Sequence, residues 1–165
     1  MSIPNLHGIQ TVDSTKLANK LNTACTKVGR SEPLRVMVQV NTSQEASKSG
    51  VSVENCAPLA RHILTSCPNL LFDGLMTIGS FVKPPIDDDF KVLKSCRTSV
   101  CEELKLDENQ IGLSMGMSHD YLLAIENGAT SVRVGSSIFG ARSYAPGKEP
   151  QPKTAEPTTS STTTQ

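Results

Sequence analysis

Two short turns in the last third of the chain contain the residues best suited to bind a ligand. Between Gly112 and Gly140 the sequence reads GLSMGMSHDYLLAIENGATSVRVGSSIFG, which predicts strand, turn, helix, strand and turn in that order. The first turn is Ser114–Ser118 and the second is Gly135–Ser137. Their small residues and hydroxyls let backbone N–H groups approach an anion without an intervening side chain. Barrels of alternating strands and helices hold a phosphate after their last two strands, so we expect a phosphate-type site here.

Arg133 lies in the short strand before the second turn. Side chains alternate along a strand, so Arg133 and Gly135 share one face and the two neighbouring valines share the other. If the valines face outer helices, Arg133 points into the interior of the sheet, where an unpaired guanidinium is costly. Arg133 then needs an anion, a carbonyl or a ligand. Two interpretations stay open: a ligand contact, or a salt bridge to an interior carboxylate such as Asp73 or Asp13.

Four other polar residues have simpler interpretations beside the chemical ones. Ser118 can cap the helix that follows it or contact a phosphate bound there, because both roles use the same hydroxyl and N–H groups. We expect His119 to be an exposed residue of the first helical turn. Lys48 is expected to be solvated and not to form a Schiff base, since that chemistry requires a buried amine. Loop polarity explains Asn41 as well as a ligand contact does.

Alternating strands and helices must position these residues. The pattern predicts five strands, at about 9–12, 34–40, 70–78, 110–114 and 131–134. The helices between them are expected from a cap at Ser14 onward and at about 53–66, 87–104 and 120–127. Such alternation implies parallel strands with right-handed crossovers. A closed barrel needs eight units and about 250 residues, so the material suffices for a little over half.

Residues 1–144 are therefore predicted to form a partial barrel domain. Residues 145–165 are rich in Pro and Thr and cannot bury much apolar surface, so we expect a disordered tail.

Composition excludes several classes of function. Sixteen basic and sixteen acidic residues give a net charge of zero and a pI of about 6.8, which argues against nucleic-acid binding. The sequence has neither a signal-like N-terminus nor an apolar run long enough for a bilayer, which predicts a cytoplasmic protein that does not bind membranes. Five cysteines without a CxxC pair indicate reduced thiols and not a zinc site. The acidic run Asp87–Asp89 is expected to open a helix and not to bind a metal.

Four segments resemble the pyridoxal phosphate homeostasis protein family, also called the YggS/PROSC family. They are VQVNTS with Glu45, Lys48 and Gly50 after it, FDGLMTIGSF, LSMGMSHDYLLAIENGAT and VRVGSSIFGAR, over about residues 10–142. Members of this family are alanine-racemase-like barrels of fold type III that bind pyridoxal 5′-phosphate (PLP). The resemblance implies an α/β fold that corresponds to the C-terminal part, about strands 4–8, of a (β/α)8 barrel.

The resemblance also assigns roles to particular residues. It implies phosphate contacts from Ser118, Gly135 and Ser136, aided by Met117, and it places Arg133 against the ring nitrogen of the cofactor. An arginine there disfavours ring protonation and weakens the electron sink that most such enzymes use. The implied function is the binding, buffering and supply of PLP in cofactor homeostasis, without substrate turnover.

The sequence departs from the family at its N-terminus. Family members begin with a helix and three further strands, one of which carries the Schiff-base lysine in a VSK-like segment. We therefore expect a truncated form that holds PLP non-covalently at most. An amino-acid racemase-like PLP enzyme and a non-binding regulatory or interaction fragment remain alternatives. Open strand edges predict self-association, with partial exposure of four apolar residues, Val36, Val38, Leu75 and Ile78.

Overall fold

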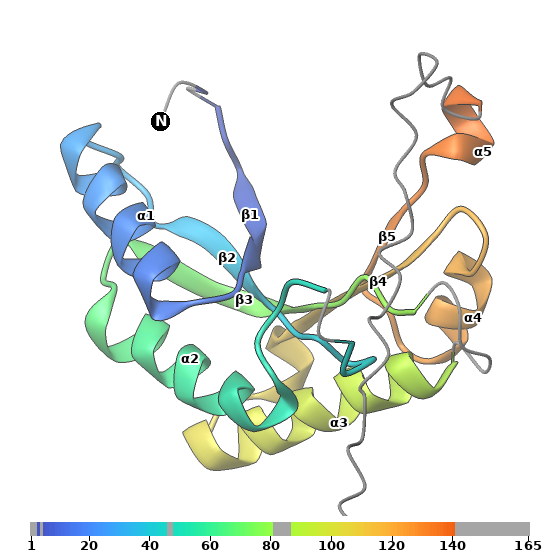
Figure 1. Cartoon of the computed structure of the whole chain (residues 1–165). Coiled ribbons are helices and arrows are strands. Elements are labelled where there is room, and N and C mark those ends of the chain that lie inside the picture. The colour runs from blue at the N-terminus through green and yellow to red at the C-terminus, as the bar shows by residue number, and fades with distance from the viewer. Residues whose placement is uncertain (1–2, 4, 46–47, 81–86, 141–165) are drawn as a thin grey trace, which may run out of the picture.

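One curled sheet of five parallel strands forms the centre of the molecule. The computed structural model describes residue 3 and residues 5–45, 48–80 and 87–140, so the predicted tail and the domain boundary at 144 lie outside the described residues. The strands are β1 (Gly8–Val12), β2 (Leu34–Gln39), β3 (Leu70–Met76), β4 (Gly112–Met117) and β5 (Ser131–Arg133), in that spatial order. The sheet curls so that β1 and β5 lie at opposite edges (Figure 1). This half-barrel confirms the predicted α/β fold.

The connecting helices follow the sequence prediction closely. They are α1 (Thr15–Lys27), α2 (Val53–Ser66), α3 (Asp87–Leu104), the 3₁₀ turn η1 (Glu108–Gln110), α4 (Tyr121–Glu126) and α5 (Ser136–Phe139). The Ser14 hydroxyl caps α1 by accepting from the Leu17 N–H at 3.3 Å. The acidic run opens α3, as expected for negative charge at the positive end of a helix dipole.

The apolar core lies between the convex face of the sheet and α1, α2 and α3 (Figure 1). Val36, Val38 and Leu75 are fully buried there, so the prediction that they would be partly exposed is wrong. They point toward the helices and not toward the open side, and the helices alone suffice to cover them. Only Ile78 of the four is exposed, at 39%. The main helix residues that complete this core are Ala18, Leu59, Ala60, Ile63, Phe90, Leu93 and Val100.

The concave face of the sheet carries polar side chains. Arg35 on β2 forms an ion pair with Asp73 on β3. The Ser114 hydroxyl on β4 donates to Gln10 Oε1 on β1 at 2.9 Å, although the two residues are 104 positions apart in sequence. A polar interior of this kind suits a ligand better than it suits dry packing.

Strand β4 extends further than the sequence predicted. The predicted strand covered residues 110–114, whereas β4 begins at Gly112 and ends at Met117. Residues 108–110 form η1. The register shifts between Ser114, which pairs with Ser131, and Met117, which pairs with Arg133. Gly116 lies in this irregularity at a φ of +88°, a conformation that glycine adopts readily. The predicted second turn likewise differs, because residues 136–139 form the short helix α5.

Two glycines face each other where β3 pairs with β4. Gly74 pairs with Gly112 across the seam. Gly74 has a φ of +155°, and a Cβ built on it would lie 2.2 Å from the Gly112 carbonyl oxygen. No side chain larger than hydrogen fits at Gly74 in this arrangement of the two strands.

Candidate functional site

The two predicted turns meet at the carboxyl ends of β4 and β5. The Ser118 hydroxyl accepts from the Gly135 N–H at 3.0 Å and from the Ser137 N–H at 3.4 Å. The Ser137 hydroxyl donates to the Ser118 carbonyl at 3.5 Å. A Cβ on Gly135 would meet nothing within 4 Å, so open space adjoins the turn. Hydroxyls, backbone N–H groups and open space thus lie together, which is the arrangement that an anion site requires.

Ser118 does not cap the following helix, and that alternative is wrong. Helix α4 begins at Tyr121, and its N-cap is Asp120. The buried Asp120 carboxylate accepts from the Met117 N–H at 2.5 Å and closes the turn between them. The Ser118 hydroxyl is therefore available to the second turn. His119 is exposed, as expected, with Nε2 3.3 Å from Asp120 Oδ2, but it precedes α4 and does not lie in its first turn.

Arg133 points to the concave side, where it bridges two other strands. Its guanidinium donates to the Ser114 hydroxyl at 2.7 Å and to the Thr77 carbonyl, just beyond β3, at 2.8 Å. Burial lowers the pKa of Arg133, and the negative charge of Asp120 opposes that effect. Two bonds use two of the five guanidinium N–H donors, so donors remain for an incoming acceptor.

The salt-bridge interpretation of Arg133 is wrong in both of its forms. Asp73 pairs with Arg35, and Asp13 accepts from the Ser14 hydroxyl. A neutral hydroxyl and a carbonyl orient the guanidinium without cancelling its charge. Arg133 therefore keeps a positive charge for a ligand.

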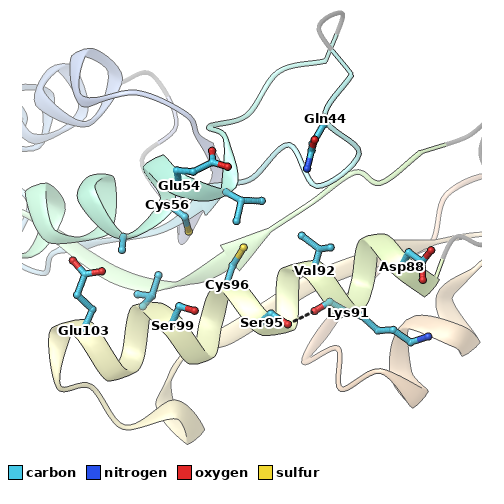
Figure 2. A pocket seen from close by; sticks show the side chains of 13 residues that line it. Gln44, Glu54, Cys56, Asp88, Lys91, Val92, Ser95, Cys96, Ser99 and Glu103 are labelled. Carbon is cyan, nitrogen blue, oxygen red and sulfur yellow. Dashed lines mark hydrogen bonds between the residues drawn. The ribbon is translucent and has the colours of Figure 1, made fainter.

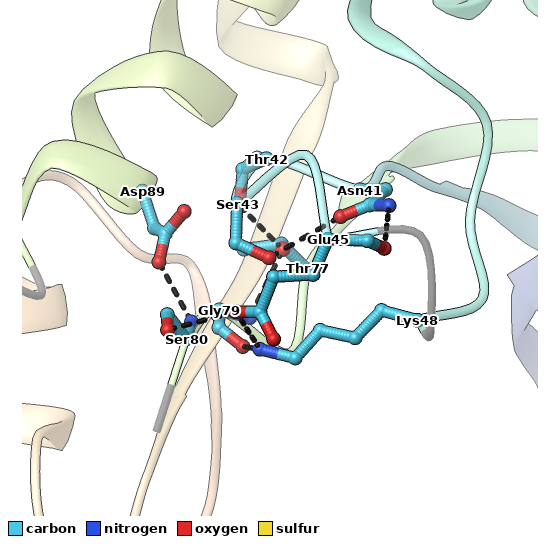
Figure 3. A network of polar contacts seen from close by, with 9 residues as sticks. All are labelled: Asn41, Thr42, Ser43, Glu45, Lys48, Thr77, Gly79, Ser80 and Asp89. Carbon is cyan, nitrogen blue, oxygen red and sulfur yellow. Dashed lines mark hydrogen bonds and ion pairs between the residues drawn. The ribbon is translucent and has the colours of Figure 1, made fainter. Parts of the chain in front are cut away.

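A cluster of polar contacts joins the loop after β2 to the loop after β3 (Figure 3). Lys48 Nζ donates to Glu45 Oε1 at 2.9 Å and to the Gly79 carbonyl at 2.7 Å. The Ser80 hydroxyl donates to the same Glu45 oxygen at 2.9 Å. These bonds, that from Lys48 first, lower the pKa of Glu45. We call Glu45, Lys48, Gly79 and Ser80 the loop clasp.

The loop clasp overturns one prediction. The Lys48 side chain is only 22% exposed and is not solvated as expected. Its carbonyl partner comes from a loop 31 residues further along the chain, which the local sequence around Lys48 does not reveal. Asn41 likewise serves its own loop, because its side-chain amide donates to the Glu45 carbonyl at 2.9 Å.

Thr77 connects the loop clasp to Arg133. Its hydroxyl lies 2.9 Å from the Thr42 hydroxyl and accepts from the Gly79 N–H at 3.1 Å, while its carbonyl accepts from Arg133. Sequence reasoning missed Thr77 and the Ser114 hydroxyl as partners of Arg133. Ser114 had a readable signal, since it is a polar residue on the inward face of an otherwise apolar strand.

Two searches of the described residues concern metal ions and membranes. No group of three or more His, Cys, Asp or Glu side chains in residues 3, 5–45, 48–80 and 87–140 could hold a metal ion. Within the same ranges, no helix has both the length and the apolar character needed to cross a bilayer.

Comparison with known proteins identifies the family. Residues 3–143 match the family model described as alanine racemase, N-terminal domain. The chain belongs to this family. The match includes both turns, β5 and the loop clasp, so the site lies inside the shared domain.

Individual relatives refine the comparison. The pyridoxal phosphate homeostasis protein of Bos taurus is 51% identical over 148 residues, which are 88% of this chain and 54% of that protein. A solved structure of an unknown protein from Bifidobacterium adolescentis has a TM-score of 0.75 at 35% identity and covers 84% of this chain and 55% of its own. PipY of Synechococcus elongatus, solved with PLP bound, has a TM-score of 0.66 at 26% identity over 81% of this chain and 61% of its own.

The chain therefore spans a little over half the length of these relatives. The resemblance to pyridoxal phosphate homeostasis proteins inferred from the motifs is confirmed.

Proposed function

We propose that this chain binds PLP at the carboxyl ends of β4 and β5 and belongs to a protein of PLP homeostasis. The observation that carries this proposal is the meeting of the two turns at the Ser118 hydroxyl, 3.0 Å from the Gly135 nitrogen. Ser118, Gly135 and Ser136 would hold the phosphate, with Met117 beside them. Relatives named pyridoxal phosphate homeostasis protein, and the structure of PipY with PLP bound, support the choice of ligand.

The residues present fit a phosphorylated pyridine aldehyde. The Gly135 and Ser137 N–H groups donate to the Ser118 hydroxyl, and a phosphate oxygen would replace that hydroxyl as their acceptor; the Cβ position of Gly135 is open. The Arg133 guanidinium supplies positive charge from the concave side. A bound PLP supplies a reactive aldehyde and a pyridine ring that can accept electron density.

Arg133 argues for holding the cofactor and against turnover. A guanidinium donates hydrogen bonds and accepts none, so it stabilises a ring nitrogen that lacks a proton. Bonds to the Ser114 hydroxyl and the Thr77 carbonyl orient the Arg133 guanidinium, which supports this role. An unprotonated ring is a weaker electron sink. We infer a carrier and not an enzyme, in a cytoplasmic location consistent with the five free cysteines.

PLP is expected to bind without a covalent bond to Lys48. An imine requires an unprotonated amine, whereas Lys48 Nζ is held by a carboxylate and a carbonyl. The test is titration of the purified chain with PLP, followed by borohydride reduction and peptide mapping. We expect saturable binding, no stoichiometric pyridoxyl group on Lys48 and no racemisation of alanine.

Three outcomes would contradict the proposal. Absence of saturable binding would contradict the assignment of PLP as the ligand. Stoichiometric labelling of Lys48 would remove the non-covalent mode. Racemisation of alanine that is lost in Arg133→Ala would favour the enzyme alternative.

A further inference from the structure

A cavity of about 800 Å³ lies between α2 and α3 (Figure 2), and Arg133 is not among the residues that line it. Both apolar side chains and charged or polar side chains line it. The lining includes Val53, Cys56, Ala57, Val92, Cys96 and Val100, together with Glu54, Lys91 and Glu103. Neither the sequence motifs nor the proposed PLP site involves this cavity.

Two thiols face each other at this cavity. Cys56 comes from α2 and Cys96 from α3, and their sulfur atoms point toward one another between the two helices (Figure 2). Cys25, Cys67 and Cys101 are also buried and free, but they do not line the cavity. The pair therefore combines mutual proximity with an adjoining space that a small reagent can occupy.

The two sulfurs are electrostatically unequal. A hydrogen bond from the Cys56 thiol lowers the pKa of Cys96, and the same bond together with burial raises the pKa of Cys56. The hydrogen bond thus favours the charged form at Cys96 and the neutral form at Cys56. A thiolate beside a second thiol is the arrangement that reacts with peroxides and then closes to a disulfide.

We propose that Cys56 and Cys96 form an oxidisable dithiol that closes to a disulfide between α2 and α3 on reaction with hydrogen peroxide. The Cys96 thiolate attacks one peroxide oxygen, the O–O bond breaks, and a sulfenic acid forms as hydroxide leaves and takes up a proton to become water. The Cys56 sulfur then displaces the sulfenic hydroxyl, which leaves as a second water with the Cys56 proton. Two thiols lose two electrons in total, and the peroxide gains them.

Small residues around the thiols permit the closure. Disulfides require Cα atoms about 4.4–6.8 Å apart, which is closer than helix axes usually pack. Ala57 on α2 and Ser95 and Ser99 on α3 line the same cavity and offer little steric resistance to a small approach of the helices. The bond would link positions 40 residues apart in sequence, since 96 − 56 = 40, and would constrain the unfolded chain accordingly.

The test is treatment of the purified chain with hydrogen peroxide, followed by peptide mapping without reduction. We expect one intramolecular Cys56–Cys96 linkage, a loss of two hydrogen masses, and a midpoint of thermal unfolding raised by about 5 °C or more. Dithiothreitol should reverse both changes. Cys56→Ser and Cys96→Ser should each abolish the linkage, while Cys25→Ser, which alters a buried thiol outside the cavity, should keep it.

Several outcomes would overturn the proposal. They are linkage through other cysteines, linkage only between chains, oxidation of Cys96 to sulfinic acid without linkage, and no reaction at either sulfur. Peptide mapping of the unmutated chain decides among these outcomes even if a serine variant fails to fold. None of the readouts depends on PLP, so this proposal stands or falls apart from the proposed function.

Discussion

Arg133 reaches from β5 across β4 to the Thr77 carbonyl beyond β3, and its replacement tests the proposed site directly. Arg133→Ala should weaken PLP binding by about tenfold or more, since a hydrogen bond to a charged group contributes about 1.5–3 kcal/mol. Fluorescence or calorimetric titration measures the change.

Arg61→Ala is the matched control for this substitution. Arg61 lies on α2 and pairs with Glu103 on α3 at 2.6 Å, with half of its side chain exposed. The Arg61→Ala variant should bind PLP with the affinity of the unmutated chain. Unfolding curves of both variants check that each is folded. Equal affinity in the two variants would argue against a ligand role for Arg133.

Glu45 predicts how stability depends on pH. The loop clasp lowers its pKa in the folded state below the ordinary value of 4.5. A lowered folded pKa stabilises the protein above the unfolded pKa, and this stabilisation is lost as pH falls through the folded value. The Glu45→Gln variant should therefore have a lower free energy of unfolding than the unmutated chain at neutral pH. This difference should shrink as the pH falls from about 5 to about 3. Denaturant unfolding at several pH values measures the difference in free energy of unfolding. A difference that does not change with pH would show that the charge of Glu45 does not stabilise the fold.

At the scale of elements, Gly116 makes the approach of β4 to α4 possible. A Cβ there would lie 2.5 Å from the Ala124 Cβ and 3.0 Å from the Tyr121 Cα, at a φ of +88°. Gly116→Ala should destabilise the fold by about 2 kcal/mol or more and displace the first turn.

Gly128 offers a control that separates backbone strain from crowding. It has a φ of +92°, but a Cβ on it would meet nothing within 4 Å. Gly128→Ala should therefore cost only about 1 kcal/mol, from the backbone conformation alone. Similar losses in the denaturation midpoints of both variants would mean that the contact with α4 is unimportant.

The elements that the sequence predicted well are those with a clear local signal. Helices α2 and α3 have the predicted bounds, because amphipathic spacing and terminal residues define them locally. The extension of β4 to Met117 was missed, since a positive-φ glycine inside a strand resembles a turn until its pairing with β5 is known.

The candidate site shows the same limit. Alternation predicted the inward direction of Arg133 correctly, but its partners on β4 and beyond β3 depend on the curl of the sheet. The loop clasp and the facing thiols of Cys56 and Cys96 join separate segments, so no local pattern reveals them.

At the scale of the whole molecule, β1 and β5 are the edge strands of the sheet that the described residues form. Such edges can pair with other chains, and apolar side chains such as Leu71, Ile138 and Phe139 are exposed at 46%, 67% and 85%. We expect self-association of the purified chain at micromolar concentration, measured by size-exclusion chromatography with light scattering.

Thr11→Lys tests whether the β1 edge is responsible. Thr11 is exposed on β1, and a lysine on an edge strand discourages pairing with other chains. This variant should shift the population toward monomer. If the unmutated chain stays monomeric and unfolds in one sharp transition, the expectation is contradicted. Packing of the helices on the convex face would then be sufficient for a stable monomer.

The spacing of β3 and β4 where Gly74 pairs with Gly112 affects the width of the concave face. The absence of a side chain at Gly74 permits this spacing of β3 and β4, since the Gly112 backbone occupies the position of a Gly74 Cβ. A larger residue at position 74 would collide with the Gly112 backbone and push β4 and β5 away from β2 and β3. The Arg133 guanidinium would then no longer span the distance to Thr77. The reach of Arg133 thus depends on Gly74, a residue outside the set proposed to hold PLP.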